Sequence, residues 1–275
     1  MYYRTIPTGR RGSGCSGRLI MAGAIALFSI ISYFGSKQNN PITGETQYIN
    51  ISTDQEIALG LQAAPQMEQE FGGEDANTSD QALVDQTGNQ IVQNSPAGNS
   101  PYQFDFHLLA DPQTINAFAL PGGQVFITRA LFDKLQTEGE LAGVLGHEIG
   151  HVIARHSAEQ IAKTQLTEGL TGAAVIATYD PNNPASANSA QVAALIGQLI
   201  TLKFSRSDEL EADRLGVCFM NNTGYDPNEM IDVMKILEAS QTGNQPPEFL
   251  STHPDPGNRI QQIQQDMQNI NSCPR

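Results

Sequence analysis

The chain has 275 residues, a formal net charge of −14, 39% hydrophobic residues and three cysteines. This length provides one substantial domain and a terminal segment. A chain this acidic binds nucleic acid poorly, so we expect no nucleic-acid partner. Three cysteines do not make a disulfide scaffold, so we expect no disulfide-rich fold.

The N-terminal segment is basic and then apolar. Residues 1–18 contain four arginines and no acid, so the remainder of the chain carries −18. Residues 19–34 are almost wholly apolar, which is longer than a usual signal-peptide core and slightly short of a clear membrane span. We interpret residues 19–35 as an uncleaved membrane anchor; a cleaved signal peptide and a buried helix are the alternatives. Because the arginines precede the anchor, they should stay in the cytoplasm while the rest of the chain crosses.

The rest of the chain is expected to be a linker and one domain. Residues 36–50 are polar and contain proline and glycine, which is typical of a juxtamembrane linker. Residues 51–275 should form a mainly helical α+β domain. Apolar periodicity and turn residues predict helices over 53–71, 81–93, 227–239 and 258–270, and short strands over 102–110 and 114–128. The stretches 168–178 and 190–204 are each too short to cross a bilayer and are predicted to be core helices joined by a mobile loop.

The most informative segment is the predicted helix that contains His147-Glu148-Ile149-Gly150-His151. Thr137 and Glu140 have the spacing of a capping box and place the start of the helix before this motif. Two histidines four residues apart lie about 40° apart around a helix, so both imidazoles can bind one metal ion. Glu148 is then placed to act as a general base on water. The alternative is a buried helix with two hydrogen-bonded histidines.

Three glycines interrupt this helix at Gly143, Gly146 and Gly150. Each costs roughly 1 kcal/mol relative to alanine, so their presence needs a reason. We expect that another backbone or a substrate approaches the helix closely at these positions.

The other histidines are weaker candidates for a metal ligand. His156 follows His151 by five residues and should lie about 140° around the helix, facing away from the metal. His107 lies in an alternating, strand-like segment, where we expect a structural role.

A catalytic zinc ion usually takes three protein ligands and keeps one position open. Glu209 and Asp213 are four residues apart, so they share a face of the next predicted helix. One of them can bind the metal while the other accepts the ring N–H of a ligating histidine. Glu211 should point to the other side, into solvent. The alternative for Glu209 is an exposed acidic helix face.

At these residues the chain resembles the membrane-associated zinc metalloendopeptidases that include HtpX, BepA and the CAAX prenyl proteases. Their H-E-x-x-H motif is followed some tens of residues later by E-x-x-A-D, and here these motifs are residues 147–151 and 209–213. Residues 116–123 are similar to the edge strand and turn of the family. Residues 251–254, together with Arg259, are similar to a late segment near its active site.

The resemblance extends over roughly residues 50–271 and implies a zincin-like metalloprotease domain that has a small β-sheet beside the H-E-x-x-H helix and binds one Zn²⁺ per chain. The implied metal site consists of the ligands His147, His151 and Glu209, the base Glu148 and the supporting Asp213. The implied substrate strand consists of Asn116, Ala117, Phe118 and Ala119, and the implied oxyanion donors are His253 and Arg259. His253 also fits a fourth zinc position in a latent form, or an ordinary loop histidine, and the strand can be purely structural.

The implied function is a zinc-dependent endopeptidase that cleaves unfolded or misfolded polypeptides in protein quality control at the cell envelope. Only one hydrophobic segment and no helical repeats are found, so partner-binding roles of repeat domains are not implied. A zinc-bound, proteolytically silent holdase or adaptor is the alternative. A metal-dependent hydrolase of another bond has no glycine-rich phosphate loop in its favour.

The expected location is the bacterial inner membrane, with a single pass and the catalytic domain on the periplasmic side. The intermembrane space of an organelle is the alternative. Either compartment is oxidising enough for Cys218 to pair with Cys273 and so join the Glu209 helix to the C-terminus. Two free thiols are the alternative for these cysteines.

Overall fold

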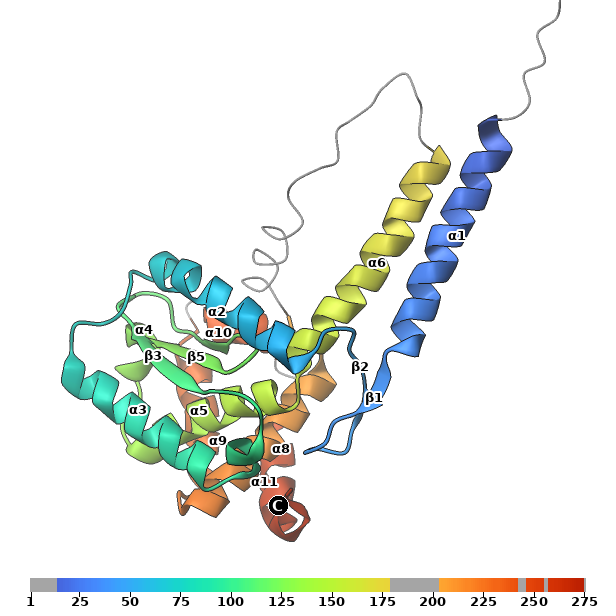
Figure 1. Cartoon of the computed structure of the whole chain (residues 1–275). Coiled ribbons are helices and arrows are strands. Elements are labelled where there is room, and N and C mark those ends of the chain that lie inside the picture. The colour runs from blue at the N-terminus through green and yellow to red at the C-terminus, as the bar shows by residue number, and fades with distance from the viewer. Residues whose placement is uncertain (1–13, 179–202, 242–245, 255–256, 275) are drawn as a thin grey trace, which may run out of the picture.

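The computed structural model describes residues 14–178, 203–241, 246–254 and 257–274. Helices surround a small sheet, and a pair of long helices extends away from them (Figure 1). The predicted class, a mainly helical α+β fold with a small sheet beside the H-E-x-x-H helix, is confirmed.

The sheet has three strands in the order β3-β5-β4, namely Asp105–Leu109, Gln124–Thr128 and Ala117–Ala119. β3 runs parallel to β5, and β4 runs antiparallel to it and forms an edge. The predicted strand over 114–128 is therefore two strands. The turn between them uses positive φ angles at Gly122 and Gly123, of 88° and 111°. A Cβ on Gly122 would lie 2.4 Å from the Cα of Ile57, so only glycine fits there.

The buried centre of the fold is the pair of helices α5 (Glu138–Ile153) and α8 (Arg206–Thr223). The capping hydroxyl of Thr137 begins α5 where the sequence predicts it, and every residue from Gly139 to Ile153 is buried. A Cβ on Gly150 would lie 3.0 Å from the carbonyl oxygen of Ala212. The glycines of α5 thus admit the backbone of a neighbouring helix, which is one of the two expected reasons for them.

Helix α5 does not continue through His156. It ends at Ile153, Arg155 takes a left-handed conformation with φ 59°, and α6 (His156–Thr178) begins in a new direction. The Arg155 guanidinium donates to the Glu56 carboxylate and to the Ile51 carbonyl oxygen. These contacts hold the turn, which has a strained conformation for a residue with a side chain.

The segment 36–50, predicted to be a linker, contains a two-stranded hairpin. β1 (Lys37–Asn39) pairs with β2 (Thr46–Tyr48) in antiparallel register. The Asn40 amide donates to the Ile153 carbonyl oxygen at 2.8 Å, and the Gln47 amide donates to that of Ala154. The hairpin therefore satisfies carbonyl groups that the end of α5 leaves without partners.

The remaining elements surround this centre. Helix α2 (Thr53–Glu70) starts at the predicted residue, where Ser52 and Gln55 form a capping box, and α3 (Thr78–Gln93) starts three residues earlier than predicted. The others are α4 (Arg129–Phe132), α9 (Asn228–Ala239), α10 (Glu248–Thr252), α11 (Arg259–Gln268) and the short 3₁₀ turns Pro96–Asn99 and Ile270–Ser272. A disulfide joins Cys218 of α8 to Cys273, with a Cα–Cα distance of 5.6 Å. The structure thus has the expected pairing of these cysteines and not two free thiols.

We call α1 (Gly14–Gly35) and α6 the arm and the remaining elements the body. The two helices pack along one another and extend away from the body (Figure 1). Residues 168–178 belong to α6 of the arm, so their prediction as a core helix is wrong; residues 190–202 lie outside the described part. Exposed apolar side chains of α1 include Leu19, Ile20, Leu27, Phe28, Ile31 and Phe34. Within the described ranges no helix is long and apolar enough to cross a membrane, and the predicted anchor stays a prediction.

Candidate metal centre

Helix α5 carries His147, Glu148 and His151 in the interior of the body, and all three are at least 98% buried. The Nε2 atoms of the two histidines lie 3.0 Å apart. The spacing of four residues thus brings both rings to one side of the helix, as the sequence predicts.

Helix α8 supplies the two acidic residues, and the structure separates their positions. The carboxylate of Glu209 lies 3.5 Å from Nε2 of both His147 and His151. Asp213 is on the other edge of the first ring, where its Oδ1 lies 2.9 Å from Nδ1 of His147. Glu209 therefore faces the atoms that converge, and Asp213 accepts the N–H of a histidine from outside.

His253 enters the same space from the end of α10. Its Nδ1 lies 3.1 Å from Glu209 Oε1 and 3.3 Å from His147 Nε2, and its Nε2 lies 3.7 Å from Glu148 Oε1. The ring stacks on Phe249 with centroids 4.4 Å apart. Ligand atoms of His147, His151, Glu209 and His253 lie within 4.8 Å of one another, and we call these four residues the donor cluster.

Arg259, the first residue of α11, is buried against the acidic residues of α8. Its Nε and Nη2 donate to the two oxygens of Asp213 at 2.8 and 2.6 Å, and its Nη1 lies 3.3 Å from Glu209 Oε2. A bidentate pair of this kind fixes the carboxylate in orientation as well as in charge. Arg259 thereby orients the Asp213 carboxylate, which in turn orients His147. The role of oxyanion donor expected for Arg259 from the sequence stays a prediction.

The prediction that His156 faces away is wrong. Its side chain is 99% buried, and its Nδ1 lies 2.8 Å from Nδ1 of His151. The cause is the turn at Arg155, which ends α5 and redirects the ring toward the site. Glu211, predicted to be solvated, is mostly buried instead, with Oε2 3.3 Å from Nε2 of His156.

These contacts fix which nitrogen of each ligating ring is free. A carboxylate only accepts, so Glu211 takes the Nε2–H of His156, whose Nδ1 then accepts the Nδ1–H of His151. Asp213 likewise takes the Nδ1–H of His147. In their neutral forms both rings therefore have the Nε2 lone pair facing the cluster.

Burial and charge act in opposite directions on the ionisable groups. Burial alone would lower the pKa of His147, but hydrogen bonds with Asp213 and Glu209 outweigh it and raise this pKa to about 9. Burial, followed by repulsion from His147, lowers the pKa of His151 well below its usual value. Burial would raise the pKa of Glu209, yet His253 and His147 hold it well below the usual range. Burial raises the pKa of Glu148. Since metal ligands must be deprotonated, a cation that binds here displaces the proton of His147.

The residues fit a divalent metal ion. Within the described residues, both carboxylate oxygens of Glu148 and Nε2 of His253 are buried without a hydrogen-bond partner. Buried polar atoms without partners are costly unless a cation or a water satisfies them. Imidazole nitrogens with one carboxylate are the ligand set that catalytic zinc sites use. His107, in contrast, lies apart in β3, where its Nε2 bonds to Gln124 and its ring stacks on Phe126.

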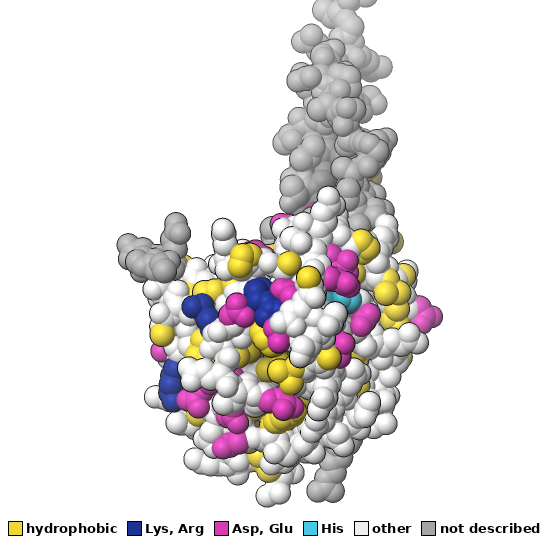
Figure 2. All heavy atoms as spheres, turned by 90° about the vertical axis from the view of Figure 1, so that its left-hand side faces the viewer, with side chains coloured by type: hydrophobic (Ala, Val, Ile, Leu, Met, Phe, Trp, Pro, Cys, Tyr) yellow, Lys and Arg dark blue, Asp and Glu magenta, His cyan; other side chains and the backbone are white. Residues whose placement is uncertain are grey.

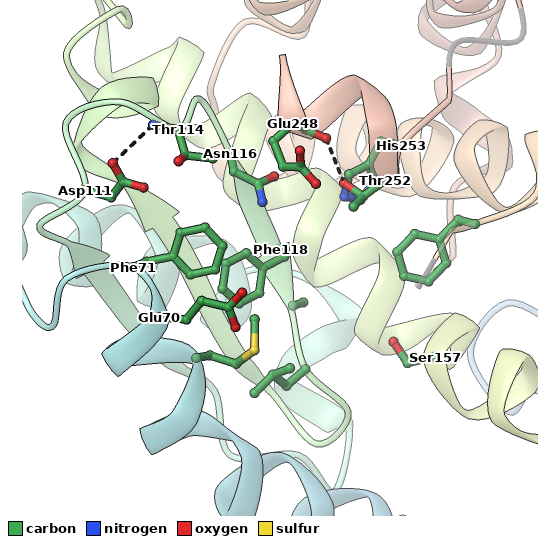
Figure 3. A pocket seen from close by; sticks show the side chains of 14 residues that line it. Glu70, Phe71, Asp111, Thr114, Asn116, Phe118, Ser157, Glu248, Thr252 and His253 are labelled. Carbon is green, nitrogen blue, oxygen red and sulfur yellow. Dashed lines mark hydrogen bonds between the residues drawn. The ribbon is translucent and has the colours of Figure 1, made fainter. Parts of the chain in front are cut away.

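The predicted substrate strand lies beside this cluster. Residues Ala117–Ala119 form the edge strand β4, which packs against α5, and Asn116 precedes it. A cavity of about 300 Å³ opens between β4, the end of α2 and α10, and His253 is part of its wall (Figure 3). The structure thus brings the strand and the donor cluster together through His253.

Comparisons with known proteins agree with this geometry. The model of peptidase family M48 matches residues 78–267. The chain is 33% identical over 80% of its length to the beta-barrel assembly-enhancing protease of Yersinia pestis, and covers 45% of that protein. It is 33% identical over 64% of its length to the protein of that name from Escherichia coli K12, covering 37% of it. It is 30% identical over 94% of its length to the mitochondrial metalloendopeptidase OMA1 of Schizosaccharomyces pombe, covering 73% of it. The chain therefore spans less than half of these bacterial relatives.

Proposed function

The chain belongs to peptidase family M48 and is a metalloendopeptidase, and we propose that it uses zinc to cleave unfolded or misfolded polypeptides at the cell envelope. The observation that carries the proposal is the donor cluster beside Glu148, whose two buried carboxylate oxygens have no hydrogen-bond partner among the described residues. In a purely structural core, a buried carboxylate without donors beside four converging ligand residues would be unexpected.

We assign one zinc ion to His147, His151 and Glu209. When bound, the zinc supplies Lewis acidity to the scissile carbonyl and to the attacking water. Glu148 accepts the proton of that water and passes it to the leaving amine. Asp213 and the pair His156–Glu211 hold the two imidazoles in the tautomers that binding requires.

His253 has two roles that its position supports. With His253 included, the donor cluster is a closed set of four ligands, which is typical of a structural rather than a catalytic zinc site. We therefore propose that the described arrangement is a latent one and that His253 moves aside to open a position for substrate. We assign to the displaced imidazole the stabilisation of the developing oxyanion.

The substrate class follows from the edge strand. β4 is paired on one side only within the described sheet, so an extended polypeptide can add to it through backbone hydrogen bonds. Such bonds do not depend on side chains, and only an unfolded segment can offer them. We assign Asn116, Ala117, Phe118 and Ala119 to this contact.

For location, we propose a single-pass protein of the bacterial inner membrane, with residues 1–18 in the cytoplasm, 19–35 as the anchor and the domain over 51–275 in the periplasm. The exposed apolar side chains of α1 support an anchor, and the Cys218–Cys273 disulfide supports an oxidising compartment. The names of the relatives refer to β-barrel assembly and to mitochondria, which fits a protein of a membrane-bounded compartment.

The test joins metal content to turnover in the full-length chain and in Glu148→Gln. We expect one zinc per chain in both proteins, chelator-sensitive cleavage of unfolded casein by the wild type, and a loss of about a hundredfold to ten-thousandfold in the variant, since only the base is removed. One zinc with no cleavage by either protein, even after the latent form is challenged with excess substrate, would favour a silent holdase. A chain without zinc would refute the metal assignment.

A further inference from the structure

The cavity beside β4 has an apolar floor and an acidic wall. Phe71 and Phe118 pack with ring centroids 5.3 Å apart, and Met67 and Leu120 are buried beneath. Three carboxylates, from Glu70, Asp111 and Glu248, line the same cavity, and no lysine or arginine is among the described residues that line it. Figure 2 shows one face of the body on which acidic side chains are scattered with few basic ones among them. The charge of the cavity is therefore negative on a chain that is itself acidic.

The carboxylates are available to a ligand. Figure 3 shows the side chains of Glu70 and Glu248 turned toward the space between them. Asp111 is held in place because its Oδ1 accepts the backbone N–H groups of Gln113 and Thr114. Burial acts to raise the pKa of Asp111, but the hydrogen bonds from these neighbours outweigh it and keep the pKa below its usual value. Asp111 is thus charged at neutral pH.

Asn116 gives an independent sign of a ligand. It is 96% buried, and its Oδ1 has no hydrogen-bond partner among the described residues. Figure 3 shows its amide directed into the cavity, toward Glu248. A buried acceptor without a donor costs free energy unless something in the cavity supplies one. The unsatisfied amide oxygen of Asn116 requires a hydrogen-bond donor, and the neighbouring carboxylates favour a donor that is positively charged.

We propose that this cavity binds the side chain of an arginine or lysine in the substrate, at a position close to the scissile bond. The proposal rests on the peptidase function proposed above. Both side chains have an aliphatic stem that covers apolar surface and a cationic head that donates hydrogen bonds. The stem lies on the floor made by Phe71 and Phe118, and the head reaches the carboxylates and Asn116. Because His253 belongs to both the cavity wall and the donor cluster, the bound residue is a near neighbour of the cleaved bond.

The first experiment measures cleavage by the full-length chain. Unfolded casein is digested and the cut sites are mapped by mass spectrometry, which identifies the position at which basic residues are enriched. Two peptides that differ only there, arginine against glutamine, then give a ratio of kcat/KM. We expect a ratio of about 10, which falls as salt rises because part of the attraction is screened. Equal cleavage of the two peptides would overturn the proposal.

The carboxylates are tested with a matched pair of double variants. Glu70→Gln with Glu248→Gln removes two charges from the cavity, and we expect the ratio to fall to about 2. Glu45→Gln with Asp54→Asn removes the same charge from exposed positions outside the cavity, and we expect the ratio of the wild type. If both pairs lower the ratio equally, the preference comes from overall charge and the cavity is not its source.

Binding separates this inference from the proposed function. In the Glu148→Gln background, fluorescence anisotropy gives the dissociation constants of the same two peptides without turnover. We expect about tenfold tighter binding of the arginine peptide, lost when Glu70→Gln and Glu248→Gln are added. If the wild type cleaves nothing, the proposed function fails, while this measurement still decides the cavity. Equal binding of both peptides would refute the cavity's charge preference even in an active protease.

Discussion

The α5–α8 pair of the body and the α1–α6 pair of the arm are both long contacts between two helices, and they differ in what surrounds them (Figure 1). Helix α5 is buried on all sides and its glycines bring it against the backbone of α8. Helix α1 leaves large side chains exposed, among them Ile20 and Phe28, each at 73%.

The difference follows from what each pair must hold. Charged groups placed inside a protein are tolerable when they have partners, and the body surrounds α5 with residues that pair with its two histidines. Apart from His156, which begins α6 and contacts His151, the arm holds no buried ionisable group among its described side chains and needs only a line of contact. Burial in the body therefore serves the site as much as the stability of the fold.

The largest expected effect comes from breaking the body at its cluster. Glu209→Gln removes the charge that faces both ligating histidines and leaves Arg259 with one acidic neighbour fewer. We expect zinc binding to be lost or severely weakened and the melting temperature to fall. Zinc per chain and thermal unfolding with and without zinc measure both effects. A variant that binds zinc like the wild type would show that the third ligand has been misassigned.

A second pair of variants compares the two regions directly. Leu145→Ala empties a fully buried position of α5, and we expect the free energy of unfolding to fall by about 2–5 kcal/mol. Ile20→Ser changes an exposed position of α1 and should alter it by less than about 0.5 kcal/mol. Urea unfolding of the full-length chain measures both. If Ile20→Ser were as costly as Leu145→Ala, the exposed face of the arm would be packed against something in the folded protein.

The sequence predicts best where the signal is local. The capping hydroxyl of Thr137, the spacing of His147 and His151, and the shared face of Glu209 and Asp213 each depend on a few neighbouring residues in a regular helix. All of these appear in the structure at the expected places. The choice between Glu209 and Asp213 as ligand needed the resemblance to a family, because spacing alone treats them alike.

The sequence fails where a helix ends without a marker. Arg155 adopts a positive φ although it is neither glycine nor asparagine, so nothing in the sequence signals that α5 stops. If α5 is extended by three residues, His156 is predicted to lie on the wrong side of the helix. Glu211, which contacts His156 in the structure, then has no predicted partner and is expected in solvent. The contact between Arg259 and Asp213 spans 46 residues of chain, which no local pattern reveals. In contrast, the Pro121–Gly122–Gly123 turn is a local signal, and the resemblance of residues 116–123 to an edge strand and turn already indicates the separation of β4 from β5.

Variants of His156 and Asp213 compare two ways of holding a metal ligand. His151 is held by a second histidine, His156, whereas His147 is held directly by the carboxylate of Asp213. His156→Phe removes the acceptor of the His151 N–H, and we expect zinc affinity to fall roughly 10- to 100-fold. Asp213→Ala should cause a loss of similar size through His147. Competition with a chromophoric chelator gives the affinities, and the visible spectrum of the cobalt-substituted protein reports ligand geometry.

The matched control for this prediction is His107→Phe, which replaces another buried histidine that lies in the sheet and is not part of the donor cluster. It should leave zinc affinity and the cobalt spectrum unchanged. If His156→Phe also leaves both unchanged, the tautomer of His151 does not depend on the chain of contacts to Glu211.

The smallest effect is expected at the rim of the body, where Arg129 of α4 joins the loop before α3. Its guanidinium contacts Asp75, Asp80 and Asp133 at 2.7–3.2 Å. The hydrogen bond from Arg129, followed by one from the Asn77 backbone N–H, holds the pKa of Asp75 below its usual value. A carboxyl group whose pKa is lower in the folded state stabilises the fold above its unfolded pKa, and that stabilisation is lost as pH falls through the folded pKa. Wild type should therefore lose this contribution below about pH 4.

Arg129→Met should cost about 1 kcal/mol at pH 7, with the difference from wild type shrinking toward pH 3. Chemical unfolding at both pH values measures it, with Lys235→Met, which breaks an exposed pair with Asp232, as the control that should change little. A difference between wild type and Arg129→Met that stays constant over this range would mean that the arginine stabilises the rim by packing on Phe132 rather than through its charge.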